Sequence, residues 1–154
     1  MENKFFMRRI QEENGSVSTG VEVHDTLDAA VRSYWGRVKT AYNDPQHPGM
    51  TYVSCKIKNT AGATVAPYDM AWPKDPRSAN KFYLYHVMQE GDNISKGLDV
   101  CDDFDAAKRA FAAYMEYGYN NPNHANVTYV SCEITDRSGI VMKPFNETWN
   151  PVTE

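Results

Sequence analysis

Two histidines at matching positions of an internal repeat are the first candidates for chemistry. His47 and His124 each lie in a loop rich in Asn and Pro, just before a strand-like segment. A matched pair of imidazoles could act as general acids and bases or hold a metal. No Cys, His or carboxylate stands at ligand spacing beside either residue, so the simplest interpretation is that each histidine closes its own loop. We therefore expect no metal and no cofactor.

An acidic cluster surrounds the expected start of the second helix. Its members are Asp99, Asp102, Asp103 and Asp105. Paired carboxylates could perform acid–base chemistry or bind Mg²⁺. Helix capping and compensation of the helix dipole already explain Asp102 and Asp105. The remaining interpretation is an acidic surface that docks on a basic groove of a partner protein or imitates the charge of a nucleic acid.

Aromatic side chains are the residues to which we give most weight as binding residues. Tyr and Trp are favoured where an apolar body is buried and a polar tip stays in water, as at interfaces and over nucleobases. Trp35, Tyr114 and Tyr117 lie off the apolar stripes of the expected helices and are surface candidates. Tyr83 and Tyr85, on a first strand, could hold a nucleotide, with His47 or His124 on its polar groups.

The cysteines and the remaining motifs give no support to an enzyme. The three cysteines show no CxxC spacing and are interpreted as reduced thiols. Cys55 and Cys132 fall on an apolar strand face, where a small buried side chain is the better interpretation than a nucleophile. Cys101 replaces the His24 of the first copy, and nothing near it marks it as catalytic. The sequence contains no Gly-rich phosphate loop, Ser-His-Asp arrangement or HExxH helix.

A tandem duplication must position all of these residues. Residues 3–77 and 80–154 align without a gap at an offset of 77, and Thr51-Tyr52-Val53-Ser54-Cys55 recurs intact as residues 128–132. We therefore predict two units, residues 1–77 and 78–154, joined by the short linker Pro73–Asn80. A unit of this size is near the lower limit for a self-sufficient core, so the two are expected to be tightly coupled.

Each unit is predicted to have the order β-β-α-β-β. Apolar residues recur at helical spacing in residues 27–41 and 104–118, with Asp25 and Asp102 as expected N-caps. Residues 4–12 and 81–89 are predicted first strands, followed by short strands near 21–23 and 98–100. Half-buried third strands near 52–57 and 129–134 then form hairpins with strands at 64–68 and 141–145.

The predicted fold class is α+β: each unit is a mainly antiparallel sheet with one helix on a face, and a pseudo-twofold relates the units. The first strands are apolar on both faces. In residues 5–10 the apolar side chains alternate between the two sides, as they do in residues 82–87. Such a strand needs two covers. One is the helix of its own unit, and the other is the second copy, a second chain or a ligand.

The charge of the chain limits the classes of partner that it could bind. The net charge of −4 argues against broad binding to nucleic-acid backbones. Residues 1–77 hold ten Lys and Arg against nine Asp and Glu, whereas residues 78–154 hold six against eleven. The copies therefore share a plan but present different surfaces. With neither a signal peptide nor a membrane span in the pattern, we expect a cytoplasmic protein. A homo-oligomer is compatible with the sequence.

A family resemblance adds one expectation. The Asp-x-x-Asp-Ala-Ala helix start, followed by the Thr-Tyr-Val-Ser-Cys strand, resembles small proteins carried by bacteriophages and mobile elements. The resemblance implies an anti-defence role, such as an anti-CRISPR-like inhibitor that binds an effector protein. Our leading hypothesis is accordingly a non-catalytic protein that occludes or sequesters a protein partner. The alternatives are a nucleotide-binding sponge and an enzyme that uses the paired His or Asp residues.

Overall fold

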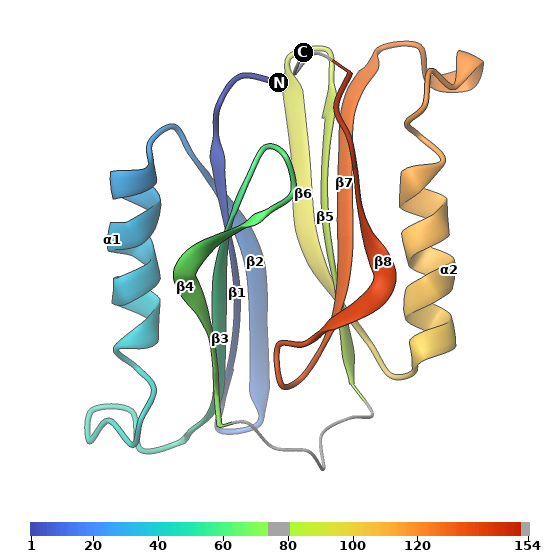
Figure 1. The fold of residues 1–154 in the computed structure, drawn as a ribbon. Helices are drawn as coiled ribbons and strands as arrows, with labels where there is room; N and C mark the ends of the chain where they lie inside the picture. Colours follow the sequence, from blue (N-terminus) through green and yellow to red (C-terminus); the bar gives the residue numbers. More distant parts are fainter. Residues whose placement is uncertain (74–80, 152–154) are drawn as a thin grey trace.

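Each copy of the repeat forms one four-stranded antiparallel sheet and one helix, in a computed structural model that describes residues 1–73 and 81–151 (Figure 1). The first copy contains β1 (Phe5–Glu13), β2 (Ser16–His24), α1 (Leu27–Val38), β3 (Met50–Asn59) and β4 (Thr64–Trp72). The second contains β5 (Phe82–Glu90), β6 (Asn93–Cys101), α2 (Phe104–Met115), the 3₁₀ turn η2 (Pro122–His124), β7 (Val127–Asp136) and β8 (Val141–Trp149). The predicted α+β class and element order are confirmed.

The two sheets have the strand orders β2-β1-β3-β4 and β6-β5-β7-β8. β1 and β2 form a hairpin that pairs nine residues of each strand, so β2 is longer than the short strand predicted near residues 21–23. The turn consists of Asn14 and Gly15, both with positive φ, which is the backbone that a two-residue hairpin requires. β6 is longer than predicted in the same way.

The N-cap of each helix lies one residue after the predicted cap. The N-caps are Thr26 and Asp103, whose side-chain oxygens accept hydrogen bonds from the backbone N–H groups of Ala29 and Ala106 at 3.1 and 2.7 Å. The prediction of Asp25 and Asp102 as caps was wrong. The Asp25 carboxylate instead accepts a hydrogen bond from Lys4 at 2.6 Å, and the Asp102 carboxylate accepts one from Lys81 at 3.2 Å.

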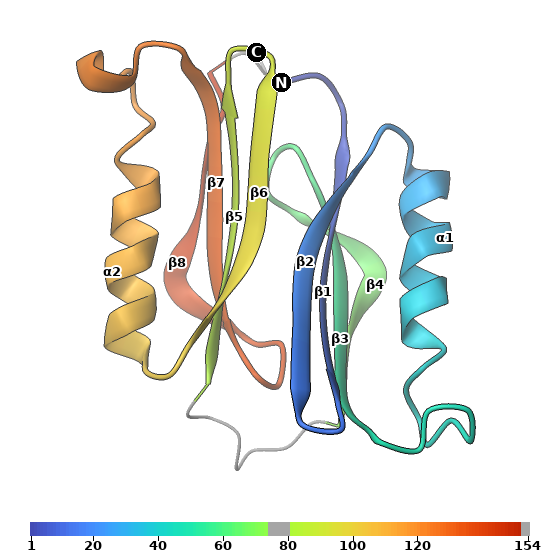
Figure 2. The same ribbon diagram turned by 180° about the vertical axis from the view of Figure 1, so that it is seen from behind.

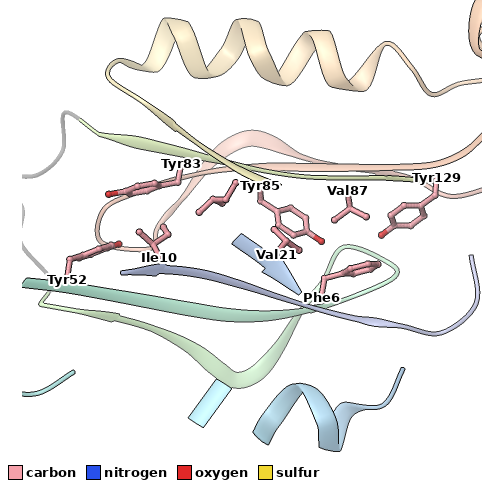
Figure 3. Close-up of a cluster of buried hydrophobic side chains, with 9 residues drawn as sticks. Phe6, Ile10, Val21, Tyr52, Tyr83, Tyr85, Val87 and Tyr129 are labelled. Atoms are coloured by element: carbon pink, nitrogen blue, oxygen red, sulfur yellow. The ribbon is translucent and has the colours of Figure 1, made fainter. Parts of the chain in front are cut away.

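The sheets pack face to face, with the helices on the two outer sides, which gives four layers in the order helix, sheet, sheet, helix (Figures 1 and 2). One apolar cluster fills the space between the sheets (Figure 3). It comprises Phe6, Ile10, Val21, Tyr52, Tyr83, Tyr85, Val87, Leu98 and Tyr129. Two further clusters join each helix to its own sheet. The second cover predicted for the first strands is therefore the other copy.

The third strands are buried on both faces, not half-buried as predicted. Nearly every residue from Tyr52 to Lys58 and from Tyr129 to Thr135 is buried. The helix-facing side carries the expected apolar residues such as Val53 and Cys55. The side that alternation assigned to solvent faces the opposite sheet instead, so polar residues of β3 and β7 lie in the interior.

Most of the predicted linker, residues 74–80, lies outside the described part of the chain, and only Pro73 of that segment is placed. In residues 1–73 and 81–151, neither helix has the length and apolar character that crossing a bilayer would need.

Candidate functional site

The predicted nucleotide-binding pair, Tyr83 and Tyr85, lies in the layer between the sheets. Each side chain is 1% exposed. Tyr83 stacks on Tyr52 of the opposite sheet, with ring centroids 6.1 Å apart, and burial raises the pKa of Tyr83 and Tyr85. Figure 3 shows both rings in the layer between the two sheets, Tyr83 beside Tyr52 and Ile10. In this arrangement the two rings pack a core and do not line an open pocket.

Asp99 and Tyr114 are brought together between α2 and the second sheet. The Tyr114 hydroxyl donates to Asp99 at 3.2 Å, and the His86 imidazole lies 3.4 Å from the same carboxylate and stacks on the Tyr114 ring. Burial lowers the pKa of His86, although Asp99 opposes this shift. Sequence reasoning missed His86. Its signal is Gly97, which is opposite His86 in the β5–β6 pairing and leaves room for the ring.

The acidic residues at the start of α2 are exposed, and two of them pair with lysines. Asp103 caps the helix, Asp102 accepts from Lys81, and Asp105 lies 3.1 Å from the Lys108 ammonium. Lysines therefore neutralise part of the charge that the sequence presents here. The capping role belongs to Asp103 and not to the expected Asp102, and the side chains of Asp102 and Asp105 are 88% and 76% exposed.

The predicted histidines each bind within their own copy. His47 Nδ1 lies 3.2 Å from a Glu13 carboxylate oxygen. The His124 ring packs on the Tyr117 ring, with the two ring centroids 4.2 Å apart. Each histidine side chain thus contacts a residue of its own copy. No group of three or more His, Cys, Asp or Glu residues is arranged to hold a metal within the described ranges 1–73 and 81–151.

Among the predicted aromatic binding residues, Trp35 is the one with an exposed side chain. Its side chain is 55% exposed and contacts the Tyr34 ring edge-on at 5.2 Å. It belongs to the α1 outer stripe, which we define as the exposed residues Asp28, Arg32, Trp35, Gly36 and Lys39. These residues recur at helical spacing and share the face of α1 turned away from the sheet.

The matching face of α2 has a different character. Where the α1 outer stripe has Trp35 and Lys39, α2 presents Ala112 and Glu116. The two remaining charged positions are the same in both copies. The duplication therefore preserved the helix but placed an exposed indole and an additional positive charge on only one of the two outer faces.

A second unusual arrangement lies between the sheets, and we name it the inter-sheet charge cluster: Arg8, Lys56, Lys58 and Glu133. All four side chains are 1% exposed or less. Lys56 Nζ donates to Glu133 Oε1 at 3.1 Å, and Lys58 Nζ donates to Glu133 Oε2 at 2.6 Å. Arg8 Nη2 donates to the Thr135 hydroxyl at 3.0 Å. Three cations of the first copy thus surround one carboxylate of the second.

Burial and charge act against each other in this cluster. Burial alone would raise the pKa of Glu133, but the adjacent Lys58 and Lys56 outweigh it and hold that pKa below its ordinary value. For Lys58 burial prevails, and its pKa lies below the ordinary value despite the attraction of Glu133. No local pattern in the sequence indicated this cluster, because alternation along the third strands assigned Lys56 and Glu133 to solvent.

Comparison with protein families, with curated proteins and with solved structures yields no match to this chain.

Proposed function

We propose that this is a non-catalytic binding protein that occludes or sequesters a protein partner through the α1 outer stripe. The observation that carries this proposal is the exposed Trp35 in the middle of a helix face, at a position where the other copy has alanine. Packing of the fold does not need the indole, because the same unit is built with Ala112 in its place.

The composition of the α1 outer stripe favours a partner with an apolar pocket bordered by acidic groups. Trp and Arg are enriched among the residues that dominate binding energy at protein interfaces, and basic residues flank the indole in the form of Arg32 and Lys39. A nucleic-acid backbone is a poorer fit. The chain has a net charge of −4, and the nearby Arg37 is already engaged by Glu22 at 3.3 Å.

The resemblance to phage and mobile-element proteins supports a bacterial effector protein as the partner. An inhibitor of this kind needs no active site, only a rigid surface that covers a functional surface of its target. The four-layer arrangement supplies such rigidity, since α1 is fixed to the sheet by a buried cluster that includes Ala30, Tyr34 and Val38.

The test is capture of a stoichiometric protein from bacterial lysates, compared between matched variants. Trp35→Ala and Arg32→Ala should reduce capture by tenfold or more, whereas Arg109→Ala, at the equivalent position of α2, should not. Ala112→Trp asks whether an indole alone creates a second site. Recovery of the bare chain, or a partner retained equally by the Trp35→Ala variant, would argue against the proposal.

We further propose that a pseudo-twofold relates the copies, and reciprocal contacts support it. The Tyr52 hydroxyl donates to the backbone carbonyl of Arg137, and the Tyr129 hydroxyl donates to that of Thr60. Positions 52 and 129 are equivalent in the repeat, as are 60 and 137. Such reciprocity is what an isologous pairing of one surface with its own copy produces.

A further inference from the structure

Contacts across the two sheets join equivalent positions of the repeat or occur in reciprocal pairs. Lys56 binds Glu133, and these residues are 77 apart, which is the repeat offset. The ring contacts are reciprocal too: Tyr52 stacks on Tyr83, and Tyr129, the counterpart of Tyr52, stacks on Phe6, the counterpart of Tyr83. The inner faces therefore meet as two copies of one surface would meet in a dimer.

Charge has nevertheless made the two inner faces different. The first-copy face contributes Arg8, Lys56 and Lys58, and the second-copy face has Tyr85, Glu133 and Thr135 at the same positions, in that order. If two first-copy faces met in this geometry, Lys56 would face another Lys56, with further buried cations beside it. If two second-copy faces met, Glu133 would face another Glu133 and find no lysine.

At the border of the interface an ion pair also joins unlike copies, but here the second copy provides the cation and the first copy the carboxylate. Arg137 of the second copy lies 3.2 Å from Glu12 of the first. The equivalent residues are Thr60 and Gln89, which carry no charge. Pairing of like copies would thus lose this ion pair as well, since Glu12 would face Thr60 and Arg137 would face Gln89.

We infer that the interface between the two inner sheet faces is specific for unlike copies. The first-copy face binds a second-copy face and rejects another first-copy face. The partner of each face is defined by charge and need not belong to the same chain. Consider one chain with two cationic inner faces and another with two anionic inner faces. Each first-copy face would then bind the second-copy face of the other chain, as in domain swapping.

The experiment uses two full-length variants, one of them labelled with ¹⁵N. Glu133→Lys makes both inner faces of a chain cationic, and Lys56→Glu with Lys58→Glu makes both faces anionic. After the two are unfolded together in urea and refolded by dilution, native mass spectrometry should show a mixed dimer at least tenfold more abundant than either like dimer. Labelled and unlabelled wild-type chains treated in the same way should remain monomers.

Two results would overturn the inference. One is a mixture in which both variants refold as stable monomers, because charge would then not decide the pairing. The other concerns the folding equilibrium constant of a single chain that carries both Lys56→Glu and Glu133→Lys. This double variant also tests the inference if the variants of the mixing experiment do not fold. The folding equilibrium constant of this double variant should be at least tenfold higher than the separate effects of Lys56→Glu and Glu133→Lys would give if they were independent. No recovery would refute the inference.

Discussion

Glu133→Gln is the substitution that most directly tests how the buried charges are held. It preserves the shape of the side chain but removes the only negative charge within hydrogen-bonding distance of the Lys56 and Lys58 ammonium groups in the described structure. Removing one partner of a buried ion pair costs about 3–5 kcal/mol, because the other charges stay buried without compensation. With a urea m-value of about 2 kcal/mol/M, the unfolding midpoint should fall by about 2 M.

The assay is equilibrium unfolding in urea at pH 7, with Glu90→Gln as the control. Glu90 is exposed at the end of β5, so its substitution should change the free energy of unfolding by less than about 0.5 kcal/mol. A Glu133→Gln variant as stable as this control would refute the claim that Glu133 neutralises the cluster.

A second substitution separates charge from packing. Lys58→Thr copies the residue that the second copy carries at position 135 and removes one of the two lysines that Glu133 neutralises. In the Glu133→Gln background it should recover about 1 kcal/mol or more, whereas in the wild type it should destabilise, because contacting charges are coupled. Additive effects of the two substitutions would contradict the electrostatic account.

Three further results are expected. Because the folded-state pKa of Glu133 lies below its ordinary value of 4.5, its contribution to stability is present above that pH and is lost as pH falls through the lower value; urea titrations from pH 7 to 3 should therefore show a steeper loss in the wild type than in Glu133→Gln. Thr26→Ala should lower the free energy of unfolding by about 1 kcal/mol, since it removes the α1 cap, and thermal unfolding measures it. Of the three thiols, only Cys101 should react quickly with a thiol reagent at pH 8 in the native state, because Cys55 and Cys132 are fully buried and burial raises their pKa to about 12. Burial raises the pKa of Cys101 too, but this thiol is only partly buried.

The elements that local physics determines were predictable from the sequence. Apolar residues at helical spacing gave both helices, and alternation with turn residues gave the strands, because each pattern lies within a few consecutive residues. The caps were misplaced by one residue. At each helix start two adjacent residues have an oxygen that can accept from the first turn, and Lys4 and Lys81 settle the choice by engaging the earlier one.

The inter-sheet charge cluster was not predictable from any local pattern. Lys56 and Lys58 alternate with apolar residues, which is the signature of a strand with one face in water. Their partner lies more than 70 residues away in the sequence and becomes visible only when the two sheets face each other. The apolar second face of the first strand did indicate that something covers the sheet, and comparison of equivalent charges would have suggested what it is.

Duplication gives this fold a freedom that a homodimer lacks. In a homodimer, one substitution changes both inner faces at once, so a lysine opposite a carboxylate cannot arise at a position that faces itself. Once the copies are joined, Lys56 and Glu133 can occupy that position together and fix the pairing. The same freedom applies outside, where Trp35 appears on α1 and Ala112 on α2. Complementary inner faces then hold together two outer helix faces that no longer have to be alike.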